Sequence, residues 1–324
     1  ERRFCRGGAL SGKNWLGLLS FAWLGTSCRS PCPLCRRQSF EPFSTKHHAF
    51  HLPKEIGNLG FLKTITIGGN HIEKVDAEVG KLKNLQNIYD YDTTYSTEAE
   101  EQMHRFFPSI YAEKFNSKAG TAYNKGQHEE AAKAIEKAIK LFPQENNYLI
   151  TKAAIIIGKE NDQKKAIAYL RRAANYREED ESSLLTATLA FSNMSFSYKC
   201  LRQNDKALEV ALEGLALLEK FPALPKRWEQ TLLFRKASAL YALNDLQASF
   251  EVYQQSLKKY PSDNASELYN LACIYARWQD RAKVLSHLAR AIAIKPAHKA
   301  EAAADSDFKD FWQDPDFMAL VEEA

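Results

Sequence analysis

The sequence predicts a mainly α-helical protein, a stack of five helical hairpins that follows a small α/β unit. Three observations support this fold class. Small side chains recur at fixed steps from Ala119 to Ala291, turn-forming residues interrupt them regularly, and an apolar pattern in residues 52 to 65 returns 23 residues later. The composition agrees, because 45% hydrophobic and 26% charged residues suit a folded chain with a sizeable core.

Each predicted hairpin carries a small residue in its first helix and three further anchors. The steps between anchors are 12, 4 and 3 residues, and a proline follows 5 residues later in three of the five copies. The first anchors are Ala119, Ala154, Ser195, Ala237 and Ala272, which lie 35, 41, 42 and 35 residues apart. Antiparallel helices approach closely only where small side chains meet, so this register favours paired helices over an ordinary bundle.

A turn signal separates the two helices of each hairpin. The five residues, which tolerate turn conformations of the backbone, are Gly126, Asn161, Asn204, Asn244 and Asp280. With this spacing, residues 111–297 resemble an array of five tetratricopeptide repeats. The resemblance implies a right-handed α-solenoid whose first helices line a concave groove for a partner peptide or helix.

The resemblance also places nine partner-binding candidates on the first helices. They are Asn116, Tyr123, Asn124, Asn193, Arg235, Tyr241, Tyr269, Asn270 and Arg277. Aromatic and arginine side chains are frequent anchors of protein interfaces. The family's clamp for a partner's terminal carboxylate needs regular Lys, Asn and Arg positions in adjacent repeats. This chain lacks that regularity, so a receptor for chaperone tails is not predicted.

Residues 298–324 resemble the short segment that closes many bacterial arrays of this family. Asp305 and Asp314 are candidate helix caps, and Pro315 stands at a favoured first helical position. Four aromatic side chains are expected to cover the open apolar face of the last hairpin, namely Phe308, Phe311, Trp312 and Phe317. An acidic metal site is the rival interpretation, but nothing in the sequence determines its ligand geometry.

Residues 62 to 72, ahead of the hairpins, match the leucine-rich repeat template. The anchors are Leu62, Ile65, Ile67, Asn70 and Ile72. The apolar pattern that begins at Leu52 recurs 23 residues later, but Ile67 then maps to Asp90 and Asn70 to Thr93. Residues 51–110 therefore resemble two leucine-rich repeats, the second degraded, followed by a helical cap at residues 96 to 108.

Residues 1–50 are predicted to be a separate N-terminal extension. Three interpretations stay open: a signal segment, a disordered segment, or translated sequence outside the natural start. Basic residues precede an apolar run from Trp15 to Leu24, and Cys28 follows, as in the lipid-attachment box of bacterial lipoproteins. That run is too short to span a bilayer, so membrane anchoring requires lipidation of Cys28.

The location of the protein depends on whether residues 1–28 act as a signal. Without a signal, the expected function is that of a cytoplasmic protein-interaction scaffold. With one, the alternative function is that of a bacterial envelope lipoprotein whose repeats assist polymer uptake or outer-membrane assembly.

No motif in the sequence has the context that catalysis needs. Gly7 to Lys13 has the spacing of a phosphate-binding loop, but Asn14 replaces the magnesium-binding hydroxyl and no nucleotide-binding domain follows. Cys28, Cys32 and Cys35 have the spacing of a radical-enzyme cluster loop without its barrel. Zinc bound with the nearby histidines lacks a second regular ligand pair. We therefore predict no enzyme activity, no cofactor and no metal.

The charge distribution argues against a nucleic-acid partner. The formal net charge is +4, but residues 1–50 hold 8 Lys or Arg and 2 Asp or Glu, which leaves 36 basic and 38 acidic residues of the totals of 44 and 40. Nucleic-acid binding needs a basic face that contacts many phosphates. The expected partner is a protein or peptide.

Overall fold

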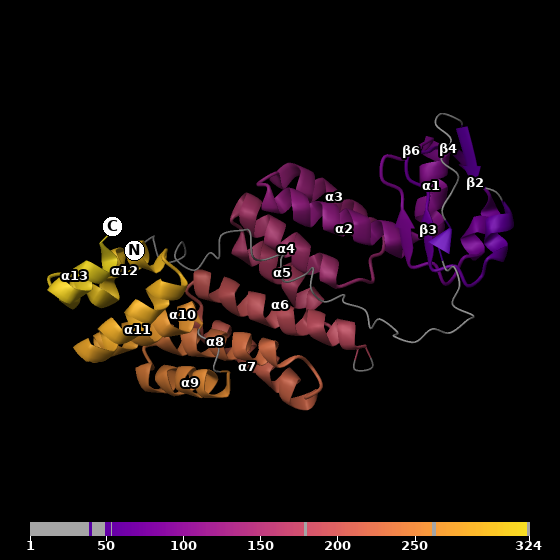
Figure 1. Cartoon of the computed structure of the whole chain (residues 1–324). Coiled ribbons are helices and arrows are strands. Elements are labelled where there is room, and N and C mark those ends of the chain that lie inside the picture. Colours follow the sequence, from indigo (N-terminus) through magenta and orange to yellow (C-terminus); the bar gives the residue numbers. More distant parts are fainter. Residues whose placement is uncertain (1–38, 41–48, 53, 178–179, 261–263, 323–324) are drawn as a thin grey trace, which may run out of the picture. The chain divides into compact units, whose positions relative to one another are not determined.

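The computed structural model describes the chain except residues 1–38, 41–48, 53, 178–179, 261–263 and 323–324. The described residues form two compact units, one that ends at Lys159 and one that begins at Glu160 (Figure 1). All described strands lie in the first unit, and the rest of the described chain is mainly helical. The predicted mainly helical class with a small N-terminal strand segment is confirmed.

Six short strands and two 3-10 helices open the first unit. Their bounds are β1 Ser39–Phe40, β2 Ala49–Leu52, η2 Lys54–Asn58, β3 Thr64–Thr66, β4 His71–Val75, η3 Ala77–Lys81, β5 Asn87–Tyr89 and β6 Thr94–Tyr95. The strands form two parallel sheets, in the orders β1-β3-β5 and β2-β4-β6. Thr64 pairs with Asn87 and His71 with Thr94, so the 23-residue step of the sequence sets the strand register.

The residues that break the repeat pattern in the second copy make specific polar contacts. The Thr93 hydroxyl donates to the Ile67 carbonyl oxygen at 2.8 Å, and the Asn70 side-chain amide donates to the same oxygen at 2.8 Å. The Asp90 carboxylate accepts from the hydroxyls of Tyr95 and Tyr111, each at 3.1 Å. Tyr111 belongs to the second α-helix after the strands, Pro108–Asn124, so Asp90 joins the strand segment to that helix.

Gly57 is expected to tolerate no side chain. A Cβ atom at Gly57 would lie 2.1 Å from the backbone oxygen of Glu78 in η3, whereas one at Gly60 would meet nothing within 4 Å. Gly57→Ala is therefore expected to lower the free energy of unfolding by about 1–3 kcal/mol, because the two 3-10 helices must separate. Urea unfolding measures this loss, and an equal loss in Gly60→Ala would contradict the steric explanation.

Thirteen α-helices and one further 3-10 helix make up the rest of the described structure. Their bounds are α1 Thr97–Phe106, α2 Pro108–Asn124, α3 His128–Leu141, α4 Asn147–Glu160, α5 Gln163–Ala173, α6 Glu181–Cys200, α7 Asn204–Lys220, α8 Lys226–Ala242, α9 Leu246–Lys259, α10 Ala265–Arg277, α11 Arg281–Ile294, α12 His298–Ala304, η4 Ser306–Phe311 and α13 Pro315–Val321. Four predicted hairpins appear as packed pairs, α2 with α3, α6 with α7, α8 with α9 and α10 with α11. The boundary between the two units falls in the remaining pair, α4 and α5.

The small anchors are buried where the paired helices meet. Ser195 donates a hydrogen bond to the Ala207 carbonyl oxygen at 2.7 Å, and Ser249 donates to that of Ala237 at 2.8 Å. Both pairs are separated by the 12-residue step of the anchor ladder. The step therefore marks the position where the second helix of a hairpin packs against the first.

At two of the five predicted turns, a residue other than the predicted one has the positive φ angle. Gly126, Asn161 and Asn244 have positive φ angles of 75°, 52° and 65°, as turn residues often do. In the third and fifth hairpins the positive φ belongs to Arg202 and Gln279 instead. The predicted residues there stand at helix starts: Asn204 is the first residue of α7, and Asp280 caps α11 by accepting from the Lys283 backbone N–H at 3.2 Å.

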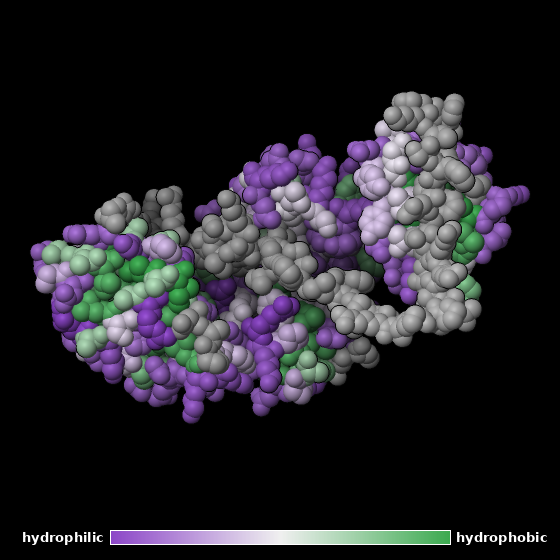
Figure 2. Space-filling view, viewed as in Figure 1, coloured by the Kyte–Doolittle hydropathy of each residue, from purple (hydrophilic) through white to green (hydrophobic). Residues whose placement is uncertain are grey.

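The C-terminal segment packs on the last hairpin through three of its four predicted aromatic residues. Phe308, Phe311 and Phe317 are buried in one core with residues of α10 and α11, whereas Trp312 is 40% exposed. Apolar surface remains visible over the region from α10 to α13 (Figure 2). The predicted caps are present, since Asp305 accepts from the Asp307 N–H at 3.0 Å and Asp314 from the Phe317 N–H at 3.1 Å.

Candidate partner-binding surface

The candidate surface lies in the second unit, on the first helices of the last three hairpins. These helices are α6, α8 and α10, and α6 packs directly against α8. Residues one and four positions after each small anchor occupy equivalent places in the repeat, so they line the same side of successive first helices. One position after the anchor stand Phe196 on α6, Ser238 on α8 and Cys273 on α10. Four positions after it stand Lys199 on α6 and Tyr241 on α8.

Arg235 connects α8 to α6. Its Nε donates to the Ser192 hydroxyl at 3.3 Å, and its guanidinium carbon lies 5.0 Å from the ring centre of Phe196 and 5.8 Å from that of Phe234. Burial lowers the pKa of Arg235 to about 10, so the side chain is still a cation at neutral pH. This predicted candidate therefore holds a positive charge between two aromatic rings.

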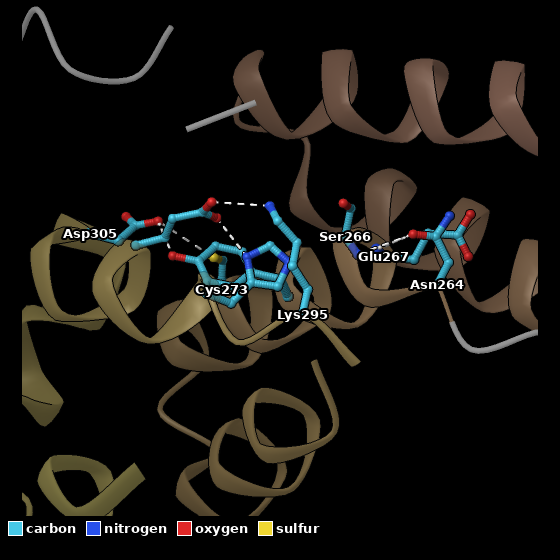
Figure 3. Close-up of polar contacts among 9 residues, drawn as sticks. Asn264, Ser266, Glu267, Cys273, Lys295 and Asp305 are labelled. Carbon is cyan, nitrogen blue, oxygen red and sulfur yellow. Dashed lines mark hydrogen bonds and ion pairs between the residues drawn. The ribbon is translucent and has the colours of Figure 1, made fainter. Parts of the chain in front are cut away.

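The two predicted tyrosines of this surface donate to the C-terminal segment of the same chain. The Tyr241 hydroxyl donates to Asp307 at 2.5 Å. The Tyr269 hydroxyl donates to Asp305, the carboxylate labelled in Figure 3, at 2.9 Å. Burial, followed by the charges of Cys273 and the aspartates, raises the pKa of both tyrosines. Both hydroxyls therefore remain neutral donors, and both are already used within the chain.

Arg277 is the predicted candidate of α10 that faces solvent. Its side chain is exposed, donates to the Asn244 side-chain oxygen at 2.5 Å and lies 5.8 Å from the ring centre of Tyr241. Asn270 instead donates to the hydroxyl of Tyr253 at 2.7 Å. Asn270 on α10 thus links the last hairpin to α9 of the preceding hairpin, whereas the side chain of Arg277 is exposed to solvent.

Asn193 and the three candidates of the first unit have differing surroundings. Asn193 and Asn116 are buried, each with 7% exposure. Tyr123 lies against Gly158 and the ring of His128, whose centre is 5.5 Å away. Only Asn124, at the end of α2, is exposed. Among these four residues, Asn124 is therefore the one that a partner can reach.

The start of α10 is held by buried polar contacts. The Asn264 side-chain oxygen accepts from the backbone N–H groups of Ser266 and Glu267, at 3.0 and 3.4 Å (Figure 3). Glu267 has 0% exposure and accepts from the Ser256 hydroxyl at 3.1 Å. Burial raises the pKa of Glu267. These contacts position α10, which carries Tyr269, Cys273 and Arg277.

Four residues of this surface are not among the nine candidates predicted from the sequence. Phe196, Lys199 and Ser238 were not selected, although Lys199 donates to the Ser238 hydroxyl across α6 and α8. Cys273 is not among the predicted candidates either, and its side chain faces Asp305. The repeat register was the available signal, because equal distances from the small anchors identify equivalent side chains.

The N-terminal predictions fall outside the described residues. These include the lipidation site at Cys28, the loop from Gly7 to Lys13 and the cysteines up to Cys35. Within the described part of the chain, no helix combines the length and apolar character that crossing a membrane requires.

Two family models match the chain, and both describe the tetratricopeptide repeat. They cover residues 115–145, which include most of α2 and all of α3, and residues 231–263, which include most of α8 and all of α9. No curated protein matches the chain. The matches show tetratricopeptide repeats at these positions, and repeats of this kind imply a protein-interaction scaffold that is typically non-catalytic.

Proposed function

We propose that this protein is a non-catalytic scaffold that binds a segment of a partner protein, a peptide or a helix, along a concave groove formed by the first helices of its hairpins. The observation that carries the proposal is the group of aromatic and cationic side chains on the first helices α6, α8 and α10, with Phe196, Arg235 and Arg277 as its main members. Such side chains provide large contact area and directed charge, which concentrate binding energy in protein interfaces.

The centre of the proposed groove is the part of α8 and α10 that carries Arg235 and Arg277. Arg277 is exposed, and Arg235 presents a cation beside Phe196 and Phe234. The hydroxyls of Tyr241 and Tyr269 are taken by the chain's own aspartates, so these two residues support the surface through their rings. Of the other candidates, Asn193 and Asn270 support this surface as packing residues of the second unit. Asn116, Tyr123 and Asn124 belong to the first unit and remain separate candidates there.

Replacing Arg277 with alanine tests the groove assignment. We expect recovery of bound partners on the immobilised full-length chain to fall several-fold, as for loss of an interface arginine worth about 1–2 kcal/mol. Lys258→Ala is the matched control, since it also removes one exposed cation but lies on α9, a second helix. Quantitative mass spectrometry of the captured proteins measures recovery. Equal recovery for wild type and Arg277→Ala would contradict the assignment.

We also propose a division into an extension at residues 1–50, a leucine-rich repeat unit with a helical cap at 51–110, a hairpin array at 111–297 and a capping segment at 298–324. Support for the second part comes from the parallel strands that repeat every 23 residues. Limited proteolysis tests the division. Early cleavage near residue 50 supports it, and early cleavage between residues 62 and 89 would contradict it.

A further inference from the structure

We propose that Cys273, Asp305 and Asp307 form a binding site for one divalent transition-metal ion of the zinc class. The Cys273 Sγ and a carboxylate oxygen of each aspartate all lie within 4.8 Å of one another. Cys273 belongs to α10 and lies near Asp305, the N-cap residue of η4 (Figure 3). Asp307 is the second residue of η4. The ion would therefore join the C-terminal segment to the last hairpin.

The spacing of the three donor atoms is close to that of a zinc site. Bonds of about 2.3 Å to sulfur and about 2.1 Å to oxygen place tetrahedral ligand atoms about 3.4–3.6 Å apart. The Cys273 Sγ is 4.0 Å from the nearer oxygen of Asp305. Small side-chain rotations therefore bring the three atoms into coordination, and a water molecule completes the four ligands.

Neighbouring side chains orient the two carboxylates. Tyr269 donates to Asp305, and Tyr241 donates to Asp307. The Tyr269 ring is itself stacked on His298, with 4.7 Å between the ring centres. Hydrogen-bond donors of this kind hold ligating carboxylates in place around protein metal ions. The site thus requires little rearrangement to accept an ion.

The two carboxylates of the cluster attract a cation, and the Cys273 sulfur favours a metal ion that binds thiolate. Cys273 is 3% exposed, and burial, together with the charges of Asp305 and Asp307, raises the pKa of its thiol. The positive charge of Lys199 lowers the pKa of the Cys273 thiol, which partly opposes this rise. The Lys199 ammonium group donates to the Ser238 hydroxyl. A bound divalent ion would displace the thiol proton to solvent and neutralise the thiolate and carboxylates. Because a thiolate ligand favours zinc over magnesium or calcium, the site is selective.

Cobalt titration of the metal-free, full-length chain tests the site. Thiolate-bound cobalt produces a charge-transfer absorption band, and zinc is expected to displace the cobalt. Other cysteines can contribute to this band, so the decisive quantity is the number of ions bound per chain. We expect Cys273→Ser to bind one ion fewer than wild type, and the control Cys200→Ser to bind the same number as wild type.

Asp307→Asn provides a second variant that preserves the hydrogen bond from Tyr241. It removes one anionic ligand, so we expect zinc affinity at this site to fall at least tenfold and the rise of the melting temperature with zinc to shrink. If Cys273→Ser does not fold, as judged by circular dichroism, Asp307→Asn decides the question. Unchanged affinity in Asp307→Asn, or equal numbers of bound ions in wild type and folded Cys273→Ser, would overturn the proposal. Both readouts are independent of partner binding.

Discussion

Replacing Phe308 with alanine is expected to lower the free energy of unfolding of the second unit by about 3–5 kcal/mol. The side chain has 0% exposure, and its ring centre lies 5.7 Å from that of Tyr269 and 5.5 Å from that of Phe317. Its removal leaves a cavity between the last hairpin and the C-terminal segment. Stacked repeats depend on their terminal units to cover apolar surface, so this loss affects the whole end of the array.

Trp312→Ala is the matched control for Phe308→Ala. Trp312 comes from the same segment but is 40% exposed, so its loss should cost much less. Urea unfolding followed by circular dichroism compares the two variants without relying on tryptophan fluorescence. Similar destabilisation by both would mean that Phe308 does not anchor the segment.

Replacing Asp90 with alanine is expected to lower the free energy of unfolding of the first unit by about 2–3 kcal/mol. The carboxylate, 18% exposed, accepts from the hydroxyls of Tyr95 and Tyr111 and from the ammonium group of Lys114. Alanine leaves these donors without their shared acceptor. The strand segment and α2 should then separate more easily, which hydrogen exchange of β5 and α2 would detect.

Asp76→Ala is the control for this effect. Asp76 also pairs with one residue far along the chain, accepting from His51 at 3.0 Å, but the pair is exposed and such pairs contribute about 0–1 kcal/mol. A double-mutant cycle with Tyr111→Phe measures the coupling directly. Additive effects of Asp90→Ala and Tyr111→Phe would show that the two residues do not act together.

Asp305 and Asp307 connect the C-terminal segment to the first helices of the last two hairpins through hydrogen bonds. Their neighbour Phe308 anchors the segment in the core, while the two carboxylates reach Tyr269 and Tyr241 on the first helices. The segment therefore occupies the hydroxyl groups of one tyrosine in each of the last two hairpins. It leaves Arg277 exposed and uses the tyrosine hydroxyls.

The hairpins could be predicted because their signal is local and repeated. Ser195 with Ala207, and Ala237 with Ser249, stand one 12-residue step apart and meet in the structure. The turns were less certain, since the residue with positive φ in two of them is Arg202 or Gln279. Neither residue type marks a turn, but each lies in the closure of the preceding helix. The Gln203 N–H donates to the Tyr198 carbonyl oxygen at 2.9 Å and the Asp280 N–H to that of Tyr275 at 3.0 Å, a pattern that places the intervening residue in the left-handed region.

The pairing of helices, the 23-residue strand register and the burial of the small anchors can be derived from the sequence, because each depends on side-chain size at fixed spacing. The contacts of the polar residues follow from the three-dimensional packing instead. Tyr241 meets Asp307 across 66 positions, and Asp90 meets Tyr111 across 21. Such contacts have no period in the sequence. They depend on where separate helices and the terminal segment pack, which is why exposed and internally bonded candidates could be distinguished only in three dimensions.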